Sequence, residues 1–551
     1  MVQVIRTRHQ GVPDIIHIRP RELRKVTFAS SVGTVFEWYD FFLYATLAPF
    51  FAFLFFPPGN ETAALLAAFA TYAAGFIVRP FGAVLFGRFG DTVGRKYVFL
   101  ITILLMGGAT FAIGLLPTYE QVGWLAPALL VTLRITQGLA LGGEYGGAAT
   151  YVAEHTVSEH RGYVTSLIQT TASGGFLLSL IVILACRLVI DEQDFAEWGW
   201  RIPFLLSLVL LILSIYIRLR LSESPLFQYI KSRGQDSKHP LRDAFLRYPN
   251  NKNALLALLG AAAGQGVIWY TGQFYALFFL QITMKVDYLI AYGIMISALL
   301  ISIPLFLFFG WLSDRIGRKQ VILAGCLLAA MTYFPLFQML AQAVNPDLVA
   351  FQERTEVTLR ANPDNCQLHV FVGPWSNFTD CDQARDFLTD RGVSFTIIDV
   401  PANAPQTITV GDSNPIPIEN WQRETNGEAV LSALRAVGFP EQADPRDINV
   451  PLAVFIIVVM IGYVAMVYAP IAALLVEMFP TQIRYTSVSV PYHIGNGWFG
   501  GMLPLIGTAA VAATGNIYYG LWYPIIIAVM SIVIGGLFLR DTRGRELTET
   551  S

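Results

Sequence analysis

The sequence predicts an all-α membrane protein with twelve transmembrane helices in two six-helix halves. A small α/β extramembrane insert is expected between helices 9 and 10. The 551-residue chain is 54% hydrophobic and only 14% charged, whereas ordinary soluble domains are about 25% charged. Apolar stretches long enough to cross a bilayer recur along it. A ten-residue motif also occurs twice, half a chain apart once the insert is left out.

Charge and cysteine content exclude several classes of protein. A net charge of −2 argues against a nucleic-acid partner. Four cysteines argue against a disulfide scaffold and against a cysteine-based metal cluster. The glycine-rich segments lack the Lys-Ser/Thr pattern of a phosphate-binding loop. We therefore expect no metal, no nucleotide and no other cofactor.

The apolar stretches predict the positions of the transmembrane helices. The first one begins near Phe28 and is too long for a signal-peptide core, so we interpret it as a retained anchor. Each helix needs about 20 apolar residues to cross the hydrocarbon. Twelve spans are expected near 30–56, 62–89, 97–117, 124–153, 161–188, 202–221, 253–283, 288–311, 319–343, 452–479, 483–512 and 518–539.

The distribution of basic residues predicts the orientation. Both tails and the loops after spans 2, 6 and 8 carry several Lys and Arg. The opposite short loops, near 57–61, 117–123 and 513–517, contain none. Because loops rich in Lys and Arg stay in the cytoplasm, we expect a multi-pass protein of the plasma (inner) membrane, surrounded by lipid, with both termini cytoplasmic.

The same patterns divide the chain into regions. They are a cytoplasmic amino tail (1–29), an amino-terminal bundle (30–221), a cytoplasmic linker (222–252), a carboxy-terminal bundle (253–343 and 451–539), an extracytoplasmic insert (344–450) and a cytoplasmic tail (540–551). The insert holds 16 acidic residues, 7 Arg and no Lys. Its periodicity predicts a strand at 367–372, a helix at 381–392, a strand at 393–400 and a helix at 427–438.

An internal repeat supports two related halves. Gly87-Arg-Phe-Gly-Asp91-Thr-Val-Gly94-Arg95-Lys96 recurs 223 residues later as Gly310-Trp-Leu-Ser-Asp314-Arg-Ile-Gly317-Arg318-Lys319. Without residues 344–450 the chain has 444 residues, half of which is 222. Six spans duplicated in parallel orientation resemble the major facilitator superfamily. That resemblance implies two bundles that face each other and rock around a cavity at the membrane midplane.

The repeated motif is a candidate cytoplasmic gate. Glycine lets helices approach closely, and an Asp at a helix end can pair with Arg and with a neighbouring helix dipole. The alternative is that these charges only fix topology. The expected gate residues are Gly87, Asp91, Arg95, Lys96, Gly310, Asp314, Arg318 and Lys319.

Further segments are similar to one branch of that superfamily. They include Glu37-Trp-Tyr-Asp40 in span 1, Arg79-Pro-Phe-Gly82 in span 2 and Arg134-Ile-Thr-Gln137-Gly138 in span 4. Span 11 opens with Phe479-Pro-Thr-Gln-Ile-Arg484. Together they resemble the metabolite:proton symporter family, whose members carry organic acids, shikimate-like compounds or betaines. The short tail lacks the heptads of osmosensing betaine porters.

Charged residues within the spans are candidates for proton coupling. A buried charge in a bilayer is costly, so such residues usually belong to a transport pathway and have a partner. A carboxylate that faces an Arg can exchange its proton for an ion pair when access changes. We expect this role for Glu37, Asp40, Arg134 and Glu144. Alternatively, Arg134 only joins spans 1 and 4, and Asp40 is permanently paired.

Polar and aromatic residues in the spans are candidates for solute binding. These residues are Tyr39, Arg79, Gln137, Arg201, Gln265, Tyr270, Gln273, Tyr492 and Asn496. The alternatives are that Arg79 braces the kink at Pro80, that Arg201 anchors a helix at the interface, and that the others join adjacent helices. Glu154 is expected to be a solvated loop residue.

Residues 381–400 of the insert resemble the helix–turn–strand of a glutaredoxin. Phe378 stands where that family has its nucleophilic cysteine, so thiol catalysis is not expected. Instead we expect a structural disulfide between Cys366 and Cys381, because the outer compartment is oxidising in most bacteria. Shielding the outer entrance, capturing solute and docking a partner all remain open as roles for the insert.

These patterns and resemblances imply a secondary transporter rather than an enzyme. We expect proton symport that imports a small polar organic solute, most readily a carboxylate or related organic acid. The alternative solutes are a zwitterionic osmolyte such as betaine or proline, or a sugar-like molecule. A non-transporting nutrient sensor is a further alternative.

Overall fold

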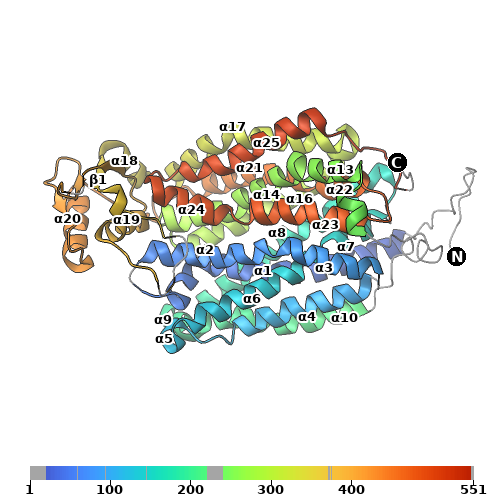
Figure 1. Cartoon of the computed structure of the whole chain (residues 1–551), viewed down its shortest axis with the longest axis horizontal. Coiled ribbons are helices and arrows are strands. Elements are labelled where there is room, and N and C mark those ends of the chain that lie inside the picture. The colour runs from blue at the N-terminus through green and yellow to red at the C-terminus, as the bar shows by residue number, and fades with distance from the viewer. Residues whose placement is uncertain are drawn as a thin grey trace, which may run out of the picture.

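The helices run along the long axis of the molecule, and the insert covers one end of the bundle (Figure 1). The computed structural model describes residues 20–58, 60–92, 95–143, 145–154, 156–219, 240–369, 373, 375–401 and 403–547. We call the end that carries the insert the insert end. The opposite end, where the described chain finishes, is the tail end. Most of the expected amino tail and of the expected linker lies outside the described residues.

The amino-terminal half contains six membrane-crossing segments. Two of them are divided into consecutive helices, α2–α3 and α6–α7. The helices are α1 (Pro20–Phe55), α2 (Glu61–Ile77), α3 (Arg79–Thr92), α4 (Arg95–Ile113), α6 (Leu125–Gly142), α7 (Tyr145–Glu154), α8 (Arg161–Val189) and α10 (Arg201–Leu219). The short helices α5 (Tyr119–Val122) and α9 (Glu192–Asp194) lie in the connections.

The carboxy-terminal half follows the same plan. Its first segment runs from α13 (Asn250–Ala257) through α14 (Ala263–Tyr270) and α15 (Ala276–Phe278) to Thr283, with three intervening π-helical stretches. The remaining helices are α16 (Tyr288–Ile316), α17 (Arg318–Val344), α21 (Val450–Tyr468), α22 (Ile471–Met478), α23 (Arg484–Ile494), α24 (Leu503–Thr514) and α25 (Trp522–Phe538). A short helix, α12 (Pro240–Phe245), precedes this half.

The described helices agree with the expected twelve spans. Ten are long and apolar enough to cross a membrane, and an eleventh is the bent pair made by residues 192–199 and 201–217. The remaining expected span, 97–117, corresponds to α4, whose apolar part is Leu100–Ile113. The fold class is therefore confirmed, and the third span is shorter than predicted.

Breaks in the helices coincide with residues that interrupt helical hydrogen bonding. The α2–α3 break at Val78 precedes Pro80, which has no N–H to donate to the preceding turn. The α21–α22 break likewise falls at Ala469 and Pro470. At the interface between the halves, α8 packs against α16 and α3 packs against α23.

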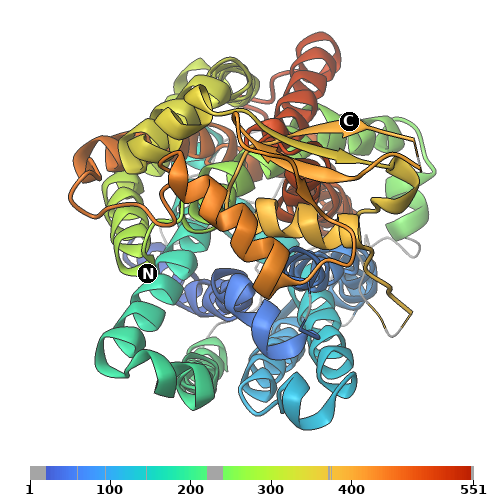
Figure 2. The same cartoon turned by 90° about the vertical axis from the view of Figure 1, so that its left-hand side faces the viewer.

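The insert is a small α/β unit whose sheet and helices lie over the ends of the bundle helices (Figure 2). Its strands are β1 (Val357–Ala361), β2 (Thr396–Asp399), β3 (Thr407–Val410) and β4 (Ile416–Pro417), in the order β2-β1-β3-β4. β1 pairs in parallel with β2, with Thr358 opposite Thr396, and antiparallel with β3. Its helices are α18 (Pro346–Arg354), α19 (Asp380–Asp390) and α20 (Glu428–Ala436).

The predicted elements of the insert are confirmed except for the first strand. The expected strand at 367–372 is wrong over 367–369, which are not extended in the sheet, and 370–372 lie outside the described residues. The parallel partner of β2 is β1 instead, whose buried residues alternate with more exposed ones as in a half-buried strand. Residues 366–369 are held by α19 through a disulfide and hydrogen bonds.

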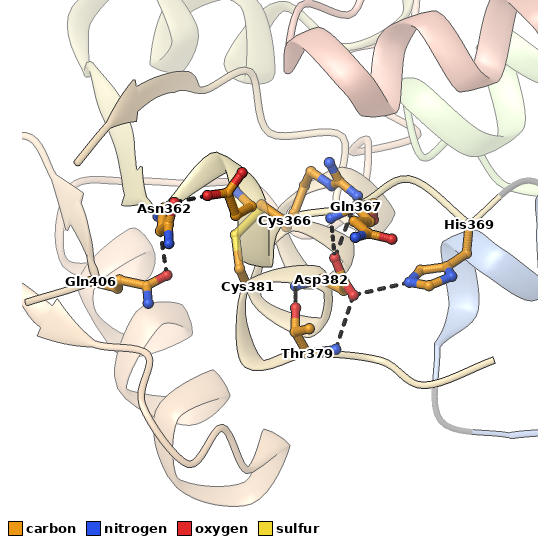
Figure 3. Close-up of a disulfide and its surroundings, with 10 residues drawn as sticks. Asn362, Cys366, Gln367, His369, Thr379, Cys381, Asp382 and Gln406 are labelled. Carbon is orange, nitrogen blue, oxygen red and sulfur yellow. Dashed lines mark hydrogen bonds and ion pairs between the residues drawn. A yellow bond between two sulfur atoms is a disulfide. The ribbon is translucent and has the colours of Figure 1, made fainter. Parts of the chain in front are cut away.

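The expected disulfide joins Cys366 to Cys381 (Figure 3). Next to it, the carboxylate of Asp382 accepts hydrogen bonds from the backbone N–H groups of Gln367 at 2.7 Å and Thr379 at 2.9 Å. The Nε2 atom of His369 lies 3.0 Å from the same carboxylate. Thr379 in turn caps the first turn of α19, so one helix end organises the loop that the disulfide closes.

Candidate functional site

Arg134 lies fully buried in the amino-terminal half. Its Nη1 donates to Oε1 of Gln137 at 2.7 Å and more weakly to the carbonyl of Phe41 at 3.4 Å. Its guanidinium carbon lies 4.4 Å from the ring centroid of Phe41 and 4.6 Å from that of Tyr44. Nε and Nη2 have no hydrogen-bond partner among the described residues. Arg134 therefore retains two donors for a further anionic or polar group.

Glycine in α2 makes room for this arginine. A Cβ atom at Gly75 would lie 3.1 Å from the carbonyl oxygen of Arg134 and 3.3 Å from its Nη2. On the other side, Nε2 of Gln137 donates to Oγ1 of Thr110 in α4 at 2.7 Å. Gln137 therefore holds Arg134 in place, and its own amide is already engaged in this conformation.

Arg79, at the first position of α3, is also fully buried. Its guanidinium carbon lies 5.0 Å from the ring centroid of Phe76 and 5.8 Å from those of Trp38 and Phe41. In the described part of the chain, none of its three side-chain nitrogens has a hydrogen-bond partner. Aromatic faces attract a cation but do not neutralise it. Arg79 is therefore a favourable place for a carboxylate.

The two acidic candidates of α1 are also buried. Glu37 is 3% exposed and Asp40 is 4% exposed. Oδ1 of Asp40 has no hydrogen-bond partner within the described ranges. Glu144, the other acidic candidate, lies outside the described residues. Two carboxylates and two guanidinium groups among the described candidates of this half are thus buried.

Tyr39 and Arg201 make helix-to-helix contacts in this conformation. The hydroxyl of Tyr39 donates to the carbonyl of Pro203 in α10 at 2.7 Å. Nη1 of Arg201 donates to the carbonyls of Gly114 at 2.9 Å and Leu116 at 2.6 Å, just beyond the end of α4. The structure therefore does not bring Arg201 to the other candidates, and a solute role for either residue remains a prediction.

The polar candidates of the carboxy-terminal half form two small clusters. Gln265 and Asn496 exchange a pair of amide hydrogen bonds at 3.0 and 2.8 Å. The hydroxyls of Tyr468 and Tyr492 lie 3.0 Å apart. Nε2 of Gln273 donates across the interface to Oγ of Ser173 at 3.2 Å. Gln273 therefore forms a direct hydrogen bond to the other half.

Aromatic rings fill the space between the halves at the centre of the molecule. Phe42 stacks on Trp269 with centroids 5.2 Å apart and lies 5.0 Å from Phe274. Phe76 meets Tyr270 edge-on at 5.3 Å. We call Phe42, Phe76, Trp269, Tyr270 and Phe274 the aromatic layer. No sequence motif assigns Phe42, Phe76 and Phe274 a role, although aromatic residues are dense in span 1.

A separate cavity of about 270 Å³ opens between the halves at the insert end. Its walls come from α1, α2 and α8, from residues 275–292 and 508–517, and from residues 389–395 of the insert. Glu37, Asp40, Arg79 and Arg134 do not line it. Phe42 lies one turn of α1 before Thr46, and Phe274 directly precedes Tyr275, both of which line the cavity, so the aromatic layer lies next to it.

The second copy of the repeated motif closes the tail end. The carboxylate of Asp314 accepts hydrogen bonds from the N–H groups of Gly162 and Tyr163, both at 2.8 Å, in the first turn of α8. Nη1 of Arg318 lies 2.6 Å from the same carboxylate. A Cβ at Gly310 would lie 2.8 Å from the carbonyl oxygen of Gly162. Gly310, Asp314 and Arg318 thus occupy the expected position between the halves.

Of the other expected gate residues, only Lys319 and Gly87 have contacts that the structure describes. Lys319 donates to the carbonyls of Gly536 and Leu539 at the end of α25, both at 2.8 Å. It therefore joins two helices of its own half. In the first copy, a Cβ at Gly87 would lie 3.4 Å from Oγ1 of Thr486 in the opposite half. The side chains of Asp91, Arg95 and Lys96 lie outside the described structure.

Two ion pairs that the sequence patterns did not indicate join the halves beside the motif. Nη1 of Arg161 lies 2.8 Å from Oε1 of Glu477, and Nη1 of Arg484 lies 3.1 Å from Oε1 of Glu154. The prediction that Glu154 is solvated is wrong, because its side chain is fully buried in this pair. The sequence does contain a pattern that could have indicated these pairs, because in each half a Glu precedes an Arg by seven residues.

Comparison with solved structures supports the fold. The chain superimposes on the proton:xylose symporter XylE bound to 6-bromo-6-deoxy-D-glucose with a TM-score of 0.58, over 97% of this chain and 99% of that one, at 17% identity. A partially occluded inward-open conformation of XylE from E. coli gives a TM-score of 0.57 at 17% identity, over 95% and 99%. At this level of identity the likeness establishes the major facilitator fold.

Sequence comparison establishes the family. Residues 26–255 match the family model "Sugar (and other) transporter". The shikimate transporter of Escherichia coli K12 is 37% identical over 328 residues, which are 58% of this chain and 74% of that protein. The alpha-ketoglutarate permease of the same organism is 36% identical, over 59% and 74%. A putative proline/betaine transporter of Staphylococcus haemolyticus is 28% identical over 95% of this chain and 89% of its own.

The chain therefore belongs to the major facilitator superfamily and, within it, to the metabolite:proton symporter family. It is a multi-pass membrane transporter and not an enzyme.

Proposed function

We propose that the protein imports a small organic carboxylate together with a proton, by alternating access between its two halves. The observation that carries the proposal is the buried group of charges in the amino-terminal half. Arg79 and Arg134 keep guanidinium nitrogens without hydrogen-bond partners among the described residues. A buried cation without a bound anion is costly in a membrane protein. A substrate carboxylate would neutralise it.

The proton follows from two buried acids of the same half. Asp40 and Glu37 are buried on the same helix, three residues apart and hence on the same face. A carboxylate in such surroundings takes up a proton unless a cation faces it. We propose that Asp40 gains or loses its proton as the arginines change between solute and acid partners. Glu37, Arg134 and Glu144 share this role in the proposal.

The remaining candidates are proposed to bind the solute from both halves. Tyr270 belongs to the aromatic layer beside Phe76, and Gln273 reaches the opposite half. Gln265, Tyr492 and Asn496 supply polar groups on the facing helices. We propose that opening of the aromatic layer frees these groups, because rings that now pack against one another would then face the solute.

The tail end is proposed to be cytoplasmic, with both termini there, because the basic residues gather in the loops at that end. The insert would then lie outside the cell membrane. A cysteine introduced at Asp412 of the insert should react with an impermeant thiol reagent in intact cells, whereas one at Glu546 should not. The opposite labelling pattern would reverse the orientation.

Two other classes of solute are compatible with the same fold. Aromatic faces bind quaternary ammonium groups, so the aromatic layer also suits a betaine, and relatives of this chain are named proline/betaine transporters. A sugar-like solute would use the polar groups without the arginines. A solute panel must therefore include all three classes.

The decisive test is uptake into proteoliposomes that contain a pH-sensitive dye. Carboxylates, shikimate, glycine betaine and xylose are added outside at symmetric pH. One carboxylate should acidify the interior, and Asp40→Asn and Arg134→Ala should abolish the signal. Asp399→Asn and Arg354→Ala, exposed residues of the insert, serve as matched controls.

Other outcomes would replace the proposal. Uptake of a labelled carboxylate without acidification would make the protein a uniporter or a differently coupled carrier. Acidification with betaine or xylose alone would change the solute class. Binding without accumulation of any labelled solute would favour a sensor.

A further inference from the structure

The cavity at the insert end is built by three parts of the protein. Phe50 and Phe53 of α1 belong to the amino-terminal half, Phe278 and Phe279 to the carboxy-terminal half, and Phe395 to the insert. In the view of Figure 2 the insert lies over this end of both bundles. With about 270 Å³, the cavity is slightly smaller than the range of about 300–1,000 Å³ typical of ligand pockets. A cavity of this size can hold a small metabolite but not a drug-sized molecule.

Two cations, one from each half, line this cavity. Arg187 comes from the end of α8, and its guanidinium carbon lies 3.4 Å from the ring centroid of Tyr288. No carboxylate of the described residues lies within 4.0 Å of Arg187. Lys285 comes from the other half, and its closest acidic partner is Asp390 at 3.8 Å. The stacked guanidinium keeps its edge available for a bidentate anion.

The acidic residues of the cavity wall are bound by other cations. Glu61 forms an ion pair with Arg423 of the insert. Asp390 lies 3.8 Å from Arg423 and 3.9 Å from Arg391, as well as 3.8 Å from Lys285. The cavity wall thus holds two cations, Arg187 and Lys285, and two carboxylates, Glu61 and Asp390. Both carboxylates already have cationic partners, so Arg187, which has no carboxylate partner in the described part of the chain, is the group that favours an anion.

We propose that this cavity is an outer binding site for a small organic carboxylate with an apolar or ring-shaped body. Arg187 and Lys285 bind the carboxylate, and the phenylalanine rings contact the apolar part. That the bound anion subsequently passes to the central arginines rests on the import function proposed above. The insert supplies one wall, so it participates directly in solute capture.

The aromatic layer gives this site its place in the transport cycle. In this proposal the layer separates the cavity from Arg79 and Arg134, while the tail end is closed by Asp314 and the two ion pairs. A solute bound in the cavity is therefore still separated from the central arginines in this conformation. Because the cavity combines a cation with aromatic rings, as the central site does, the same solute fits both.

Binding is tested on the full-length protein in lipid nanodiscs by calorimetry, with benzoate, shikimate and α-ketoglutarate as probes and benzamide as the neutral match of benzoate. The central site is disabled by Arg79→Ala with Arg134→Ala. We expect a carboxylate still to bind and benzamide not to bind. Arg187→Gln should then weaken carboxylate binding about tenfold or more, as expected for loss of one charge-assisted contact.

Three variants make this result specific. Lys285→Gln should weaken binding in the same direction, and Arg187→Lys should restore part of the affinity. Arg446→Gln removes an exposed cation of the same insert that does not line the cavity, and it should have no effect. Unchanged binding in both Arg187→Gln and Lys285→Gln would overturn the proposal.

A second measurement keeps the central site intact. In a Cys186→Ser, Cys326→Ser background, Thr389→Cys places a thiol in the cavity wall. Benzoate should slow its reaction with a methanethiosulfonate reagent but leave a thiol at Asp412→Cys unaffected. Equal rates with and without every carboxylate probe would also overturn the proposal.

The two proposals fail in different ways. Proton-coupled uptake that is insensitive to Arg187→Gln, without protection at position 389, would remove the outer site and leave the import function. Protection and binding without any uptake would leave the outer site and remove the import function.

Discussion

Arg484 and Glu154 form a buried ion pair across the two halves, with 3.1 Å between Nη1 and Oε1. Its counterpart joins Arg161 to Glu477 at 2.8 Å. In each half the Glu lies seven residues before the Arg, yet each Glu binds the Arg of the other half. The two pairs therefore exist only while the halves meet at the tail end. Separation of the halves there would break both pairs, although Glu477 would keep its contact with Arg318 of its own half, at 3.4 Å.

We predict that Glu154 and Arg484 are energetically coupled in the closed state. Removing one partner of a buried ion pair costs about 3–5 kcal/mol, because the other charge is left uncompensated. Glu154→Gln and Arg484→Gln should each speed labelling of a cysteine introduced at Thr165. The free-energy change derived from the labelling rate of the double variant should be smaller than the sum of the changes for the two single variants. Labelling rates of all four forms are measured in a background without Cys186 and Cys326.

The control for this cycle is Arg247→Gln, whose exposed ion pair with Asp243 lies within a single segment. It should not change the labelling rate. Effects that add within about 0.5 kcal/mol would show that the pair does not act as a unit.

The close approach of α8 and α16 makes a second prediction. A Cβ at Gly162 would lie 2.5 Å from Oγ of Ser313 and 2.8 Å from the carbonyl oxygen of Gly310. Gly162→Ala should therefore destabilise the closed tail end by about 1–3 kcal/mol, as overpacking does, and lower the uptake rate. The matched control is Gly293→Ala in α16, where a Cβ would meet nothing within 4 Å. Equal uptake in both variants would contradict the prediction.

The insert is attached to the amino-terminal half through Asp386. Its carboxylate accepts hydrogen bonds from the N–H groups of Glu61 at 3.1 Å and Thr62 at 2.5 Å, at the start of α2. Burial raises the pKa of Asp386 above its usual 3.8, although those N–H groups oppose the shift. The docked state therefore binds the proton more tightly than the undocked state.

By this linkage, docking is favoured as the pH falls from the raised pKa toward 3.8 and weakens as the pH rises through the raised pKa. Asp386→Asn, which keeps an acceptor without the charge, should preserve docking. Asp386→Ala should weaken it by about 1–3 kcal/mol, because two N–H groups lose their acceptor. Hydrogen exchange at residues 61–63 measures docking. Stronger protection at high pH than at low pH would refute the assignment.

The disulfide should stabilise the insert specifically. It closes a separation of 15 residues, for which about 3 kcal/mol is expected. The double change Cys366→Ser with Cys381→Ser should therefore speed proteolysis within 344–450 and leave the transmembrane helices intact by circular dichroism. Cys186→Ser, which removes a cysteine outside the bond, is the control. Identical cleavage rates would show that the bond contributes little.

The cytoplasmic gate shows which interface residues a sequence pattern can predict and which it cannot. The repeated motif alone predicts that Gly310, Asp314 and Arg318 lie at an interface, because a duplicated ten-residue match identifies equivalent positions. It does not identify Glu154 and Glu477, since a carboxylate near a loop is usually solvated. Only the packing of α7 against α22 and α23, which turns those side chains inward, distinguishes a buried pair from a surface charge.

In the insert, too, some elements could be predicted from the sequence and others depend on the tertiary fold. Periodicity predicts the helix at 381–392 and the following strand, and the oxidising compartment predicts the disulfide. The first strand was misplaced, because a short alternating segment such as 357–361 becomes a strand only when a partner is available. Its parallel partner is β2, where Ile397 pairs with Leu359 from 38 residues further along the chain. Only the tertiary fold brings these two segments together.

The sequence by itself determined the transmembrane segments, the duplication, the family and which charges lie within the spans, because each depends on local hydrophobicity or on residue identity. The tertiary structure decided which charges near the helix ends are buried and with which partners, how the aromatic layer packs between the halves, and that the insert joins both halves to form a cavity. These features depend on side chains from distant segments meeting within a few ångströms, and hydrophobic periodicity carries no information about such meetings.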